Sequence, residues 1–269
     1  MNNNGRNKSL LLCDTHCHLD LMAQRGVGIN TAIKSAMDVG IEQFVVPGVS
    51  PENWPVVAQL AKQFPPVHCT FGIHPLFIDS HSIDALPELE VRIEDSLLHS
   101  HGCIAIGECG LDFYQGRENE KLQFMVLEAQ LKMAQRFELP VLLHVRKAHN
   151  ELIQILKRHP LPKGGVLHGF SGSYEQGMEF IKCGLWLGIG GTITYPRANK
   201  TRMAVSRLPL ERLLLETDAP DMPLNGYQGT VNEPKFLNEV LSTLITLRSE
   251  TEQTIAQKLR NNTYNALQI

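Results

Sequence analysis

The chain lacks several features that would assign it to a class of protein at once. It has no C-x-x-C pair, no apolar stretch of the ~20 residues that a membrane span requires, and no G-x-G-x-x-G turn after its first apolar run. It also lacks an excess of positive charge, since 25 Lys and Arg stand against 28 Asp and Glu, for a net charge of −3. These absences argue against a membrane protein, a dinucleotide-binding sheet and a protein that coats nucleic acid through bulk charge.

Aromatic residues are also scarce, at 6% of the chain, and they form no stripe alternating with basic residues. Proteins that track along nucleic acid use such stripes, because bases stack on rings while Lys and Arg bind phosphates. A nucleic-acid substrate is therefore expected to be a strand end, a short oligonucleotide or a small phosphorylated molecule. A local basic cleft stays compatible with the sequence, because a bound metal supplies positive charge that the residue count omits.

The cysteines and the N-terminus indicate the compartment. Several of the six cysteines sit inside apolar runs, which predicts free, buried thiols in a reducing cytoplasm. Residues 1–9 are polar and rich in Asn, without the apolar core of a signal peptide, and are predicted to form a short disordered lead. The hydrophobic content of 43% is enough for a sizeable core in residues 10–269.

Short apolar runs alternate with amphipathic helical patterns along residues 10–269. Runs that are apolar without alternation are typical of strands buried on both faces. Eight such strands are predicted, at 10–14, 43–47, 68–73, 103–108, 141–145, 165–168, 185–189 and 212–217. Helices are predicted at 30–39, 53–63, 119–137, 148–157 and 174–182, with a last pair at 234–247 and 251–266. With no composition break between them, the expected fold is a single-domain α/β TIM barrel, (β/α)8, ahead of an open doubly wound sheet.

Residues that can bind a metal recur where the predicted strands end. They are His16 and His18 after the first strand, Glu108 on the fourth, His144 and His168 on the fifth and sixth, and Asp218 after the eighth. In TIM barrels the carboxyl ends of the strands form the active site. Residues two apart in extended backbone point the same way, so both imidazoles of the first pair are expected to reach one ion. A charged Glu108 would be costly in the barrel mouth unless a cation, or a salt bridge to Arg146, offset it.

Four imidazoles and two carboxylates exceed the three ligands that one tetrahedral catalytic ion needs. The surplus predicts two divalent ions, one held by His16, His18 and Asp218, the other by His144 and His168, with Glu108 bridging them. Imidazole ligands favour Zn²⁺, Mn²⁺ or Fe²⁺, and Mg²⁺ would suit only a weaker site. Two such ions activate a water and clamp the oxygens of an ester, and Asp218 is positioned to act as the general base. Glu108 and Asp218 are therefore the predicted catalytic residues.

Two other residues of the predicted mouth are expected to bind substrate. Arg146 shares the inward face of His144 and would hold a phosphate bidentately; an ion pair with Glu216 or Asp112 is the alternative. His74 follows the third strand and is predicted to donate to a phosphate oxygen or to the leaving group, with a structural role as the alternative.

Three buried residues are predicted to support the ligands or the core. Asp14 is expected to orient a His ligand. Glu216 shares the inward face of Asp218 but lies deeper, which favours a supporting role. Cys17 lies between two ligands, but strand alternation aims it away from them and predicts packing.

The residues named so far belong to five longer motifs. These are D-T-H-C-H-L-D at 14–20, G-I-H-P at 72–75, A-I-G-E-C-G-L-D-F-Y at 105–114, L-H-G-F-S-G at 167–172 and L-E-T-D-A-P at 215–220. Together they resemble the TatD-like metal-dependent hydrolases of the amidohydrolase superfamily, and in particular bacterial paralogues of TatD. The resemblance covers residues 10 to about 267, and it implies a TIM barrel, the same six metal ligands and a metal-dependent DNase activity. Cys109, Gly169 and Ala219 depart from residues common in that family, but none of them removes a ligand.

The function predicted from these patterns is two-metal hydrolysis of ester bonds, above all of phosphodiesters in DNA or oligonucleotides. The alternative is a deacylase or an amide or ester hydrolase acting on aminoacyl-tRNA or a small metabolite. A non-catalytic binding module on a barrel scaffold is a third class, and six converging polar ligands weigh against it. No membrane association and no obligate protein partner are expected, and a monomer is compatible with the sequence.

Overall fold

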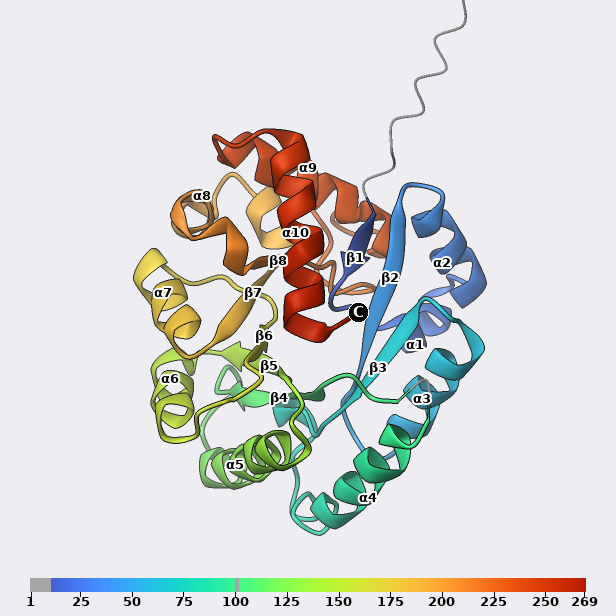
Figure 1. Ribbon diagram of the computed structural model, residues 1–269, viewed down its shortest axis with the longest axis vertical. Coiled ribbons are helices and arrows are strands. Elements are labelled where there is room, and N and C mark those ends of the chain that lie inside the picture. The colour runs from blue at the N-terminus through green and yellow to red at the C-terminus, as the bar shows by residue number, and fades with distance from the viewer. Residues whose placement is uncertain (1–10, 100–101) are drawn as a thin grey trace, which may run out of the picture.

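The computed structural model describes residues 11–99 and 102–269 and consists of a ring of strands surrounded by helices (Figure 1). The strands are β1 (Leu12–Asp14), β2 (Ile41–Gly48), β3 (Val67–Phe71), β4 (Ile106–Asp112), β5 (Val141–Arg146), β6 (Gly165–Leu167), β7 (Leu185–Ile189) and β8 (Leu213–Leu215). They form one sheet in the order β1 to β8, with parallel pairing between successive strands. This is the predicted (β/α)8 barrel. The predicted lead at 1–9 lies outside the described residues.

Hydrogen bonds at the ends of the first and last strands bring the two edges of the sheet together. The backbone N–H of Thr15 donates to the carbonyl of Leu215 over 3.0 Å, and that of Asp218 donates to the carbonyl of His16 over 2.9 Å. A third bond runs from His18 N–H to the carbonyl of Ala219 over 2.7 Å. Residues from opposite ends of the sequence are thereby held side by side.

The helices follow the strands and cover the outside of the barrel (Figure 1). They are α1 (Leu19–Met22), α2 (Ile29–Met37), α3 (Trp54–Gln63), α4 (Leu86–Leu97), α5 (Glu120–Phe137), α6 (His149–Arg158), α7 (Tyr174–Lys182), α8 (Asn199–Arg207), α9 (Leu237–Leu247) and α10 (Glu252–Leu267). The predicted helices are found within a few residues of their expected bounds, and α1, α4 and α8 add to them. A capping box sets the start of α7. The Ser173 side chain accepts from the N–H of Gln176, and the Gln176 side chain accepts from the N–H of Ser173.

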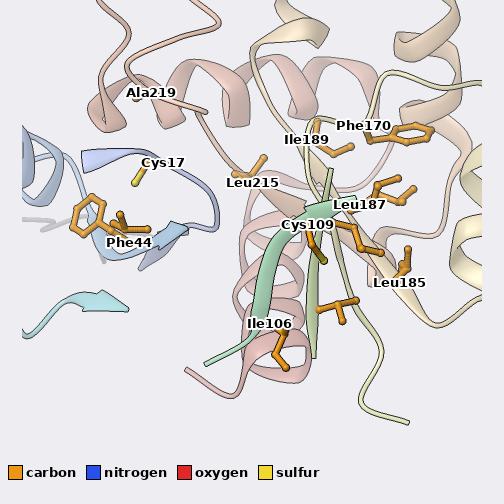
Figure 2. Close-up of a cluster of buried hydrophobic side chains, with 14 of the residues drawn as sticks. Cys17, Phe44, Ile106, Cys109, Phe170, Leu185, Leu187, Ile189, Leu215 and Ala219 are labelled. Carbon is orange, nitrogen blue, oxygen red and sulfur yellow. The ribbon is translucent and has the colours of Figure 1, made fainter. Parts of the chain in front are cut away.

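The amino ends of the strands enclose an apolar layer, which we call the barrel floor. It consists of Cys13, Val45, Ala105, Leu142, Val166 and Leu214 from the barrel and Ala266 and Leu267 from α10. These side chains are buried, and α10 closes this end of the barrel. A second and larger core lies between the strands and the helices. Part of it, around Leu185, Leu187 and Ile189 of β7, is drawn in Figure 2.

Strand β4 differs from its prediction. Glu108 does not end this strand but is its third residue, because β4 continues to Asp112. The pairing of β4 with β5 is irregular between Ile106 and Cys109. At Gly110, with φ +151°, a Cβ atom would lie only 1.9 Å from the carbonyl oxygen of His144, so a residue without a side chain is needed for the two strands to approach this closely.

The cysteine prediction is confirmed for five positions, and Cys183 is half-buried. All six cysteines are free. Cys17 is fully buried in the larger core, as its predicted packing role requires. In the part of the chain that is described, no helix is long and apolar enough to cross a membrane.

Candidate metal centre

The six predicted ligands meet around the carboxylate of Glu108 at the carboxyl ends of the strands. Its Oε2 lies 3.3 Å from Nε2 of His16 and 3.8 Å from Nε2 of His18. Its Oε1 lies 2.9 Å from Nε2 of His168 and 3.3 Å from Nδ1 of His144. The two oxygens of one buried carboxylate thus face two different pairs of imidazoles.

Asp218 lies on the side of the first pair. Its Oδ1 is 3.6 Å from Nε2 of His16 and 3.7 Å from Nε2 of His18. Asp218 has φ +58°, a left-handed conformation that a short polar side chain tolerates better than most. Three sets of ligand atoms lie mutually within 4.8 Å among the described residues: those of His16, His18 and Asp218, those of His16, Glu108 and His168, and those of His74, Glu108 and His144.

Several nitrogens of this cluster have no hydrogen-bond partner among the described residues. They are both ring nitrogens of His16 and the Nδ1 atoms of His18 and His168, all buried. The Nδ1 of His144 also lies only 3.0 Å from the Nε2 of His168. Buried polar atoms are normally paired. Of the unpaired nitrogens, Nε2 of His16 faces both Glu108 and Asp218, and such an imidazole nitrogen beside carboxylates is a donor suited to a transition metal. The residues present therefore fit a divalent cation.

The electrostatics of the cluster point the same way. Burial disfavours a charge on His168, but Glu108, Glu216 and Asp218 outweigh it and raise the pKa of His168 to about 10. Burial also disfavours the ionised form of Glu108, but the imidazoles of His74, His168 and His16 outweigh it and hold the Glu108 pKa well below its usual value. The carboxylates thus attract one buried positive charge, which a metal ion supplies in place of a proton.

Asp112 orients one of the predicted ligands, a role that the sequence did not predict. Its Oδ2 accepts from Nε2 of His144 over 3.0 Å, which leaves the His144 Nδ1 lone pair directed at Glu108. Burial disfavours ionisation of Asp112, but hydrogen bonds from His144 and the backbone of Tyr114 outweigh it and lower its pKa. The N–H of Asp112 donates to Oε1 of Gln123, which fixes the strand end. Strand alternation from Glu108 through Gly110 was the available signal.

His74 lies in the same cluster but is a donor. Its Nδ1 accepts from the N–H of Leu76 over 3.1 Å, at the start of the short helix η2 (Pro75–Phe77). Burial lowers the pKa of His74, which favours the neutral ring. A neutral ring whose Nδ1 accepts carries its proton on Nε2. That Nε2 lies 3.2 Å from Oε1 of Glu108, so His74 directs an N–H, and not a lone pair, into the site.

Arg146 is exposed at the mouth and stacks on an aromatic ring. Its guanidinium carbon lies 3.4 Å from the centroid of the Tyr114 ring. Within the described residues it forms no ion pair, although its charge helps to lower the pKa of Asp112, one of the two partners that the alternative named. Stacking on Tyr114 fixes the side chain through one face of the guanidinium and leaves its N–H groups available.

Glu216 lies behind the cluster, where the prediction placed it. Its Oε1 accepts from the N–H of Gly169 over 2.5 Å and lies 3.8 Å from Nδ1 of His168. Burial raises the pKa of Glu216 to about 8. Gly188 leaves space for this side chain, since a Cβ there would lie 2.0 Å from Oε2 of Glu216.

Asp14 supports the predicted ligand His16 through its backbone N–H and not through its ring, whose nitrogens have no hydrogen-bond partner among the described residues. Its carboxylate accepts from Thr217 N–H over 2.9 Å and from Thr217 Oγ1 over 2.6 Å, and it lies 3.4 Å from the backbone N of His16. The side chain therefore joins β1 to the chain after β8. Burial raises the pKa of Asp14 to about 7.

The TatD-related DNase family profile matches residues 13–268. The chain belongs to this family. A member in Escherichia coli K12, named uncharacterized metal-dependent hydrolase YjjV, is 43% identical over 256 residues, which covers 95% of this chain and 97% of the relative. The crystal structure of YjjV, described as a TatD homolog, matches with a TM-score of 0.92 at 42% identity, over 97% of this chain and 99% of that one.

A second TatD-family relative carries a more specific name. It is a protein of Erwinia tasmaniensis named 3'-5' ssDNA/RNA exonuclease TatD, which is 34% identical over 226 residues. The match covers 81% of this chain and 85% of the relative. A TatD-family hydrolase of Entamoeba histolytica, at 18% identity, shares the fold with a TM-score of 0.82. Membership places the chain among metal-dependent hydrolases.

Proposed function

We propose that this TatD-family protein is a two-metal hydrolase that cleaves phosphodiester bonds of DNA or oligonucleotides. The observation that carries the proposal is the position of Glu108, whose two carboxylate oxygens face separate pairs of imidazoles. The name of the Erwinia relative, an exonuclease acting on single-stranded DNA and RNA, supports nucleic acid as the substrate.

In this proposal His16, His18 and Asp218 hold one ion and His144 and His168 hold the other, with Glu108 shared between them. The imidazole-rich set suits Zn²⁺, Mn²⁺ or Fe²⁺, and Mg²⁺ would suit a weaker site. When bound, two such ions acidify a water molecule and neutralise the charge that develops on the phosphate oxygens.

The protein's own side chains move protons and bind the substrate. Asp218 is the most exposed of the two acidic ligands, at 23% of its side chain, and accepts a proton from the attacking water. His74 directs its Nε2–H into the site, where it donates to a phosphate oxygen or to the leaving group. Arg146 presents its guanidinium from the mouth and binds the phosphate of the substrate. An uncharged ester or amide would leave this guanidinium without an anionic partner, which favours a substrate that carries a phosphate; charged tRNA also carries phosphates and is distinguished by the test below.

The test uses chelated protein reconstituted with Mn²⁺, Zn²⁺ or Fe²⁺ and analysed for metal content. Single-stranded oligonucleotide, charged tRNA and a panel of small phosphodiesters are then offered separately. We expect up to two ions per chain, cleavage of the oligonucleotide, and loss of activity on chelation. Release of amino acid from charged tRNA without any cleavage of oligonucleotide would reject the phosphodiesterase assignment, and absence of stoichiometric metal would reject the two-metal site.

A further inference from the structure

Two exposed aromatic side chains flank the metal centre. Phe77 ends η2, shortly after β3, and Tyr114 lies two residues beyond the end of β4; they are 56% and 57% exposed. Among the described residues only one other Phe, Tyr or Trp is as exposed, Tyr264 on α10 near the barrel floor. In a chain with few aromatic residues, two of the three exposed rings thus lie at the carboxyl ends of adjacent strands.

Each ring is linked to Glu108 through other residues: Phe77 through His74, and Tyr114 through Asp112 and then His144. The Phe77 ring centroid is 6.0 Å from that of His74, whose Nε2 lies 3.2 Å from Glu108. Tyr114 donates its N–H to Oδ1 of Asp112 over 2.8 Å, and Asp112 binds His144. The imidazoles of His74 and His144 meet edge to face, with centroids 4.4 Å apart. The aromatic rings therefore belong to the wall of the site on the β3–β5 side.

The short helix η2 holds Phe77 in a defined position. Pro75 begins it, and the His74 side chain caps it by accepting from the N–H of Leu76. The Tyr114 ring differs from that of Phe77, because the guanidinium carbon of Arg146 lies over it, 3.4 Å from the ring centroid. The Phe77 ring thus has a face open to a planar partner, while the Tyr114 ring positions the Arg146 guanidinium. An open aromatic face beside a guanidinium matches the two parts of a nucleotide, a base and a phosphate.

We propose that Phe77 stacks on one unpaired nucleobase of a single-stranded oligonucleotide, and that Tyr114 is a positioning residue that holds Arg146 against a phosphate of the same strand. The inference rests on the proposed function. A base inside a duplex is stacked on its neighbours and offers no free face, so this wall selects single strands. Stacking is indifferent to base identity, so the selection is for unpaired structure and not for sequence.

The test compares two oligonucleotides of equal length and charge, a single-stranded oligothymidylate and the same backbone made entirely of abasic sites. The wild type is expected to cleave the base-bearing strand with the lower KM. Phe77→Ala should raise that KM roughly 5- to 100-fold, the loss expected for one base–aromatic stack, and leave the KM for the abasic strand unchanged. Phe77→Tyr should retain the preference. Met222→Ala is the control, because Met222 is also an exposed apolar residue, 51% accessible, beyond β8.

Tyr114→Ala should act differently from the Phe77 variant. It should raise KM for both strands alike, because Arg146 is no longer held in position to bind the phosphate, while kcat stays near the wild-type value. Tyr114→Phe keeps the aromatic ring and should restore KM for both strands. Equal losses on the two strands for Phe77→Ala, or no loss on either, would overturn the stacking role while nuclease activity stands. A metal-loaded wild type that cleaves neither strand would overturn the proposed function together with this inference.

Discussion

The two ends of the barrel interior use the same strands for opposite purposes. On β5, Leu142 points into the barrel floor, and two residues later His144 reaches the metal centre. On β6, Val166 lies in the floor and His168 follows at the same spacing. Because inward positions recur every second residue, a spacing of two residues along each strand separates a side chain of the apolar floor from one of the candidate metal centre.

The two ends also differ in what they need for stability. The floor gains free energy by removing apolar surface from water, on the order of 1.5–3 kcal/mol for a fully buried Leu. The mouth buries carboxylates and imidazoles, whose desolvation is costly until an opposite charge offsets it. We therefore expect the floor to be indifferent to metal and the mouth to depend on it. The predictions below test this difference.

The largest effect is expected for Glu108→Ala. Removal of the one carboxylate that faces both pairs of imidazoles should cost both ions, and activity should fall to background. Asp218→Asn should keep the ions largely in place, because an amide oxygen still coordinates, but it cannot accept a proton. Its activity should therefore fall by about 10²- to 10⁴-fold. Elemental analysis of the two variants side by side is the measurement.

A third variant completes that experiment. His144→Ala should weaken one ion selectively and leave the site of His16, His18 and Asp218 loaded. The opposite pattern, in which Glu108→Ala retains two ions and Asp218→Asn loses both, would make Asp218 the shared ligand.

Leu142→Ala tests the floor. The cavity should lower the free energy of unfolding by about 2–5 kcal/mol, because Leu142 is fully buried next to α10. Metal content and kcat per folded molecule should stay near wild type. Chemical denaturation gives the first quantity, and metal analysis and kinetics give the others. A selective loss of metal from this variant would show that the two ends of β5 are not separable.

Arg146→Ala should have a moderate effect confined to substrate. Loss of a charged hydrogen bond worth about 1.5–3 kcal/mol corresponds to a ten- to hundred-fold drop in kcat/KM for a phosphoester. The drop should come from KM, with metal content and thermal stability unchanged. Because Arg146 forms no ion pair among the described residues, unchanged kinetics would contradict the phosphate-binding role and leave its stacking on Tyr114 as a structural contact.

The smallest effect concerns pH and the metal-free protein. Burial raises the pKa of Glu216 to about 8, and the neighbouring carboxylates, against the effect of burial, raise that of His168 to about 10. A group with a raised pKa binds its proton more tightly in the folded state, so it lowers the protein's free energy of unfolding as pH rises. This loss extends over about pH 4.5 to 8 for Glu216 and about pH 6.5 to 10 for His168. The Tm of EDTA-treated protein should therefore fall between pH 7 and pH 9.

The metal-loaded protein should behave in the opposite way, because metal binding requires deprotonated ligands and strengthens with pH. Glu216→Gln is the matched control: it should remove the Glu216 part of the decline and reduce the His168 part, because Glu216 is one of the carboxylates that raise the His168 pKa. A flat Tm for the metal-free wild type over this range would contradict the electrostatic account of the mouth.

Sequence patterns predicted the barrel and the meeting of its ligands because both follow from strand alternation. Every predicted strand is present, and Glu108, His144 and His168 lie close together, as their positions required. The end of β4 was misplaced, since the irregular pairing around Gly107 and Glu108 has no simple apolar signature.

Contacts between side chains on different strands could not be predicted in the same way. That Asp112 binds His144, and that Arg146 stacks on Tyr114, depends on rotamers and on the register of β4 against β5. Asp14 illustrates the same limit: its partner, Thr217, is distant in sequence and is brought close only by the meeting of β1 and β8.

The two ring nitrogens of His74 lie between the turn that carries Phe77 and the candidate metal centre. One nitrogen caps the turn that carries Phe77, and the other faces the carboxylate that both ions would share. A cation that draws Glu108 away from His74 alters the ring that supports the stacking surface. Under the proposed function, metal affinity and oligonucleotide affinity would be thermodynamically coupled, and such coupling is reciprocal. The factor by which a bound ion would raise the affinity for an oligonucleotide equals the factor by which the oligonucleotide would raise the affinity for the ion.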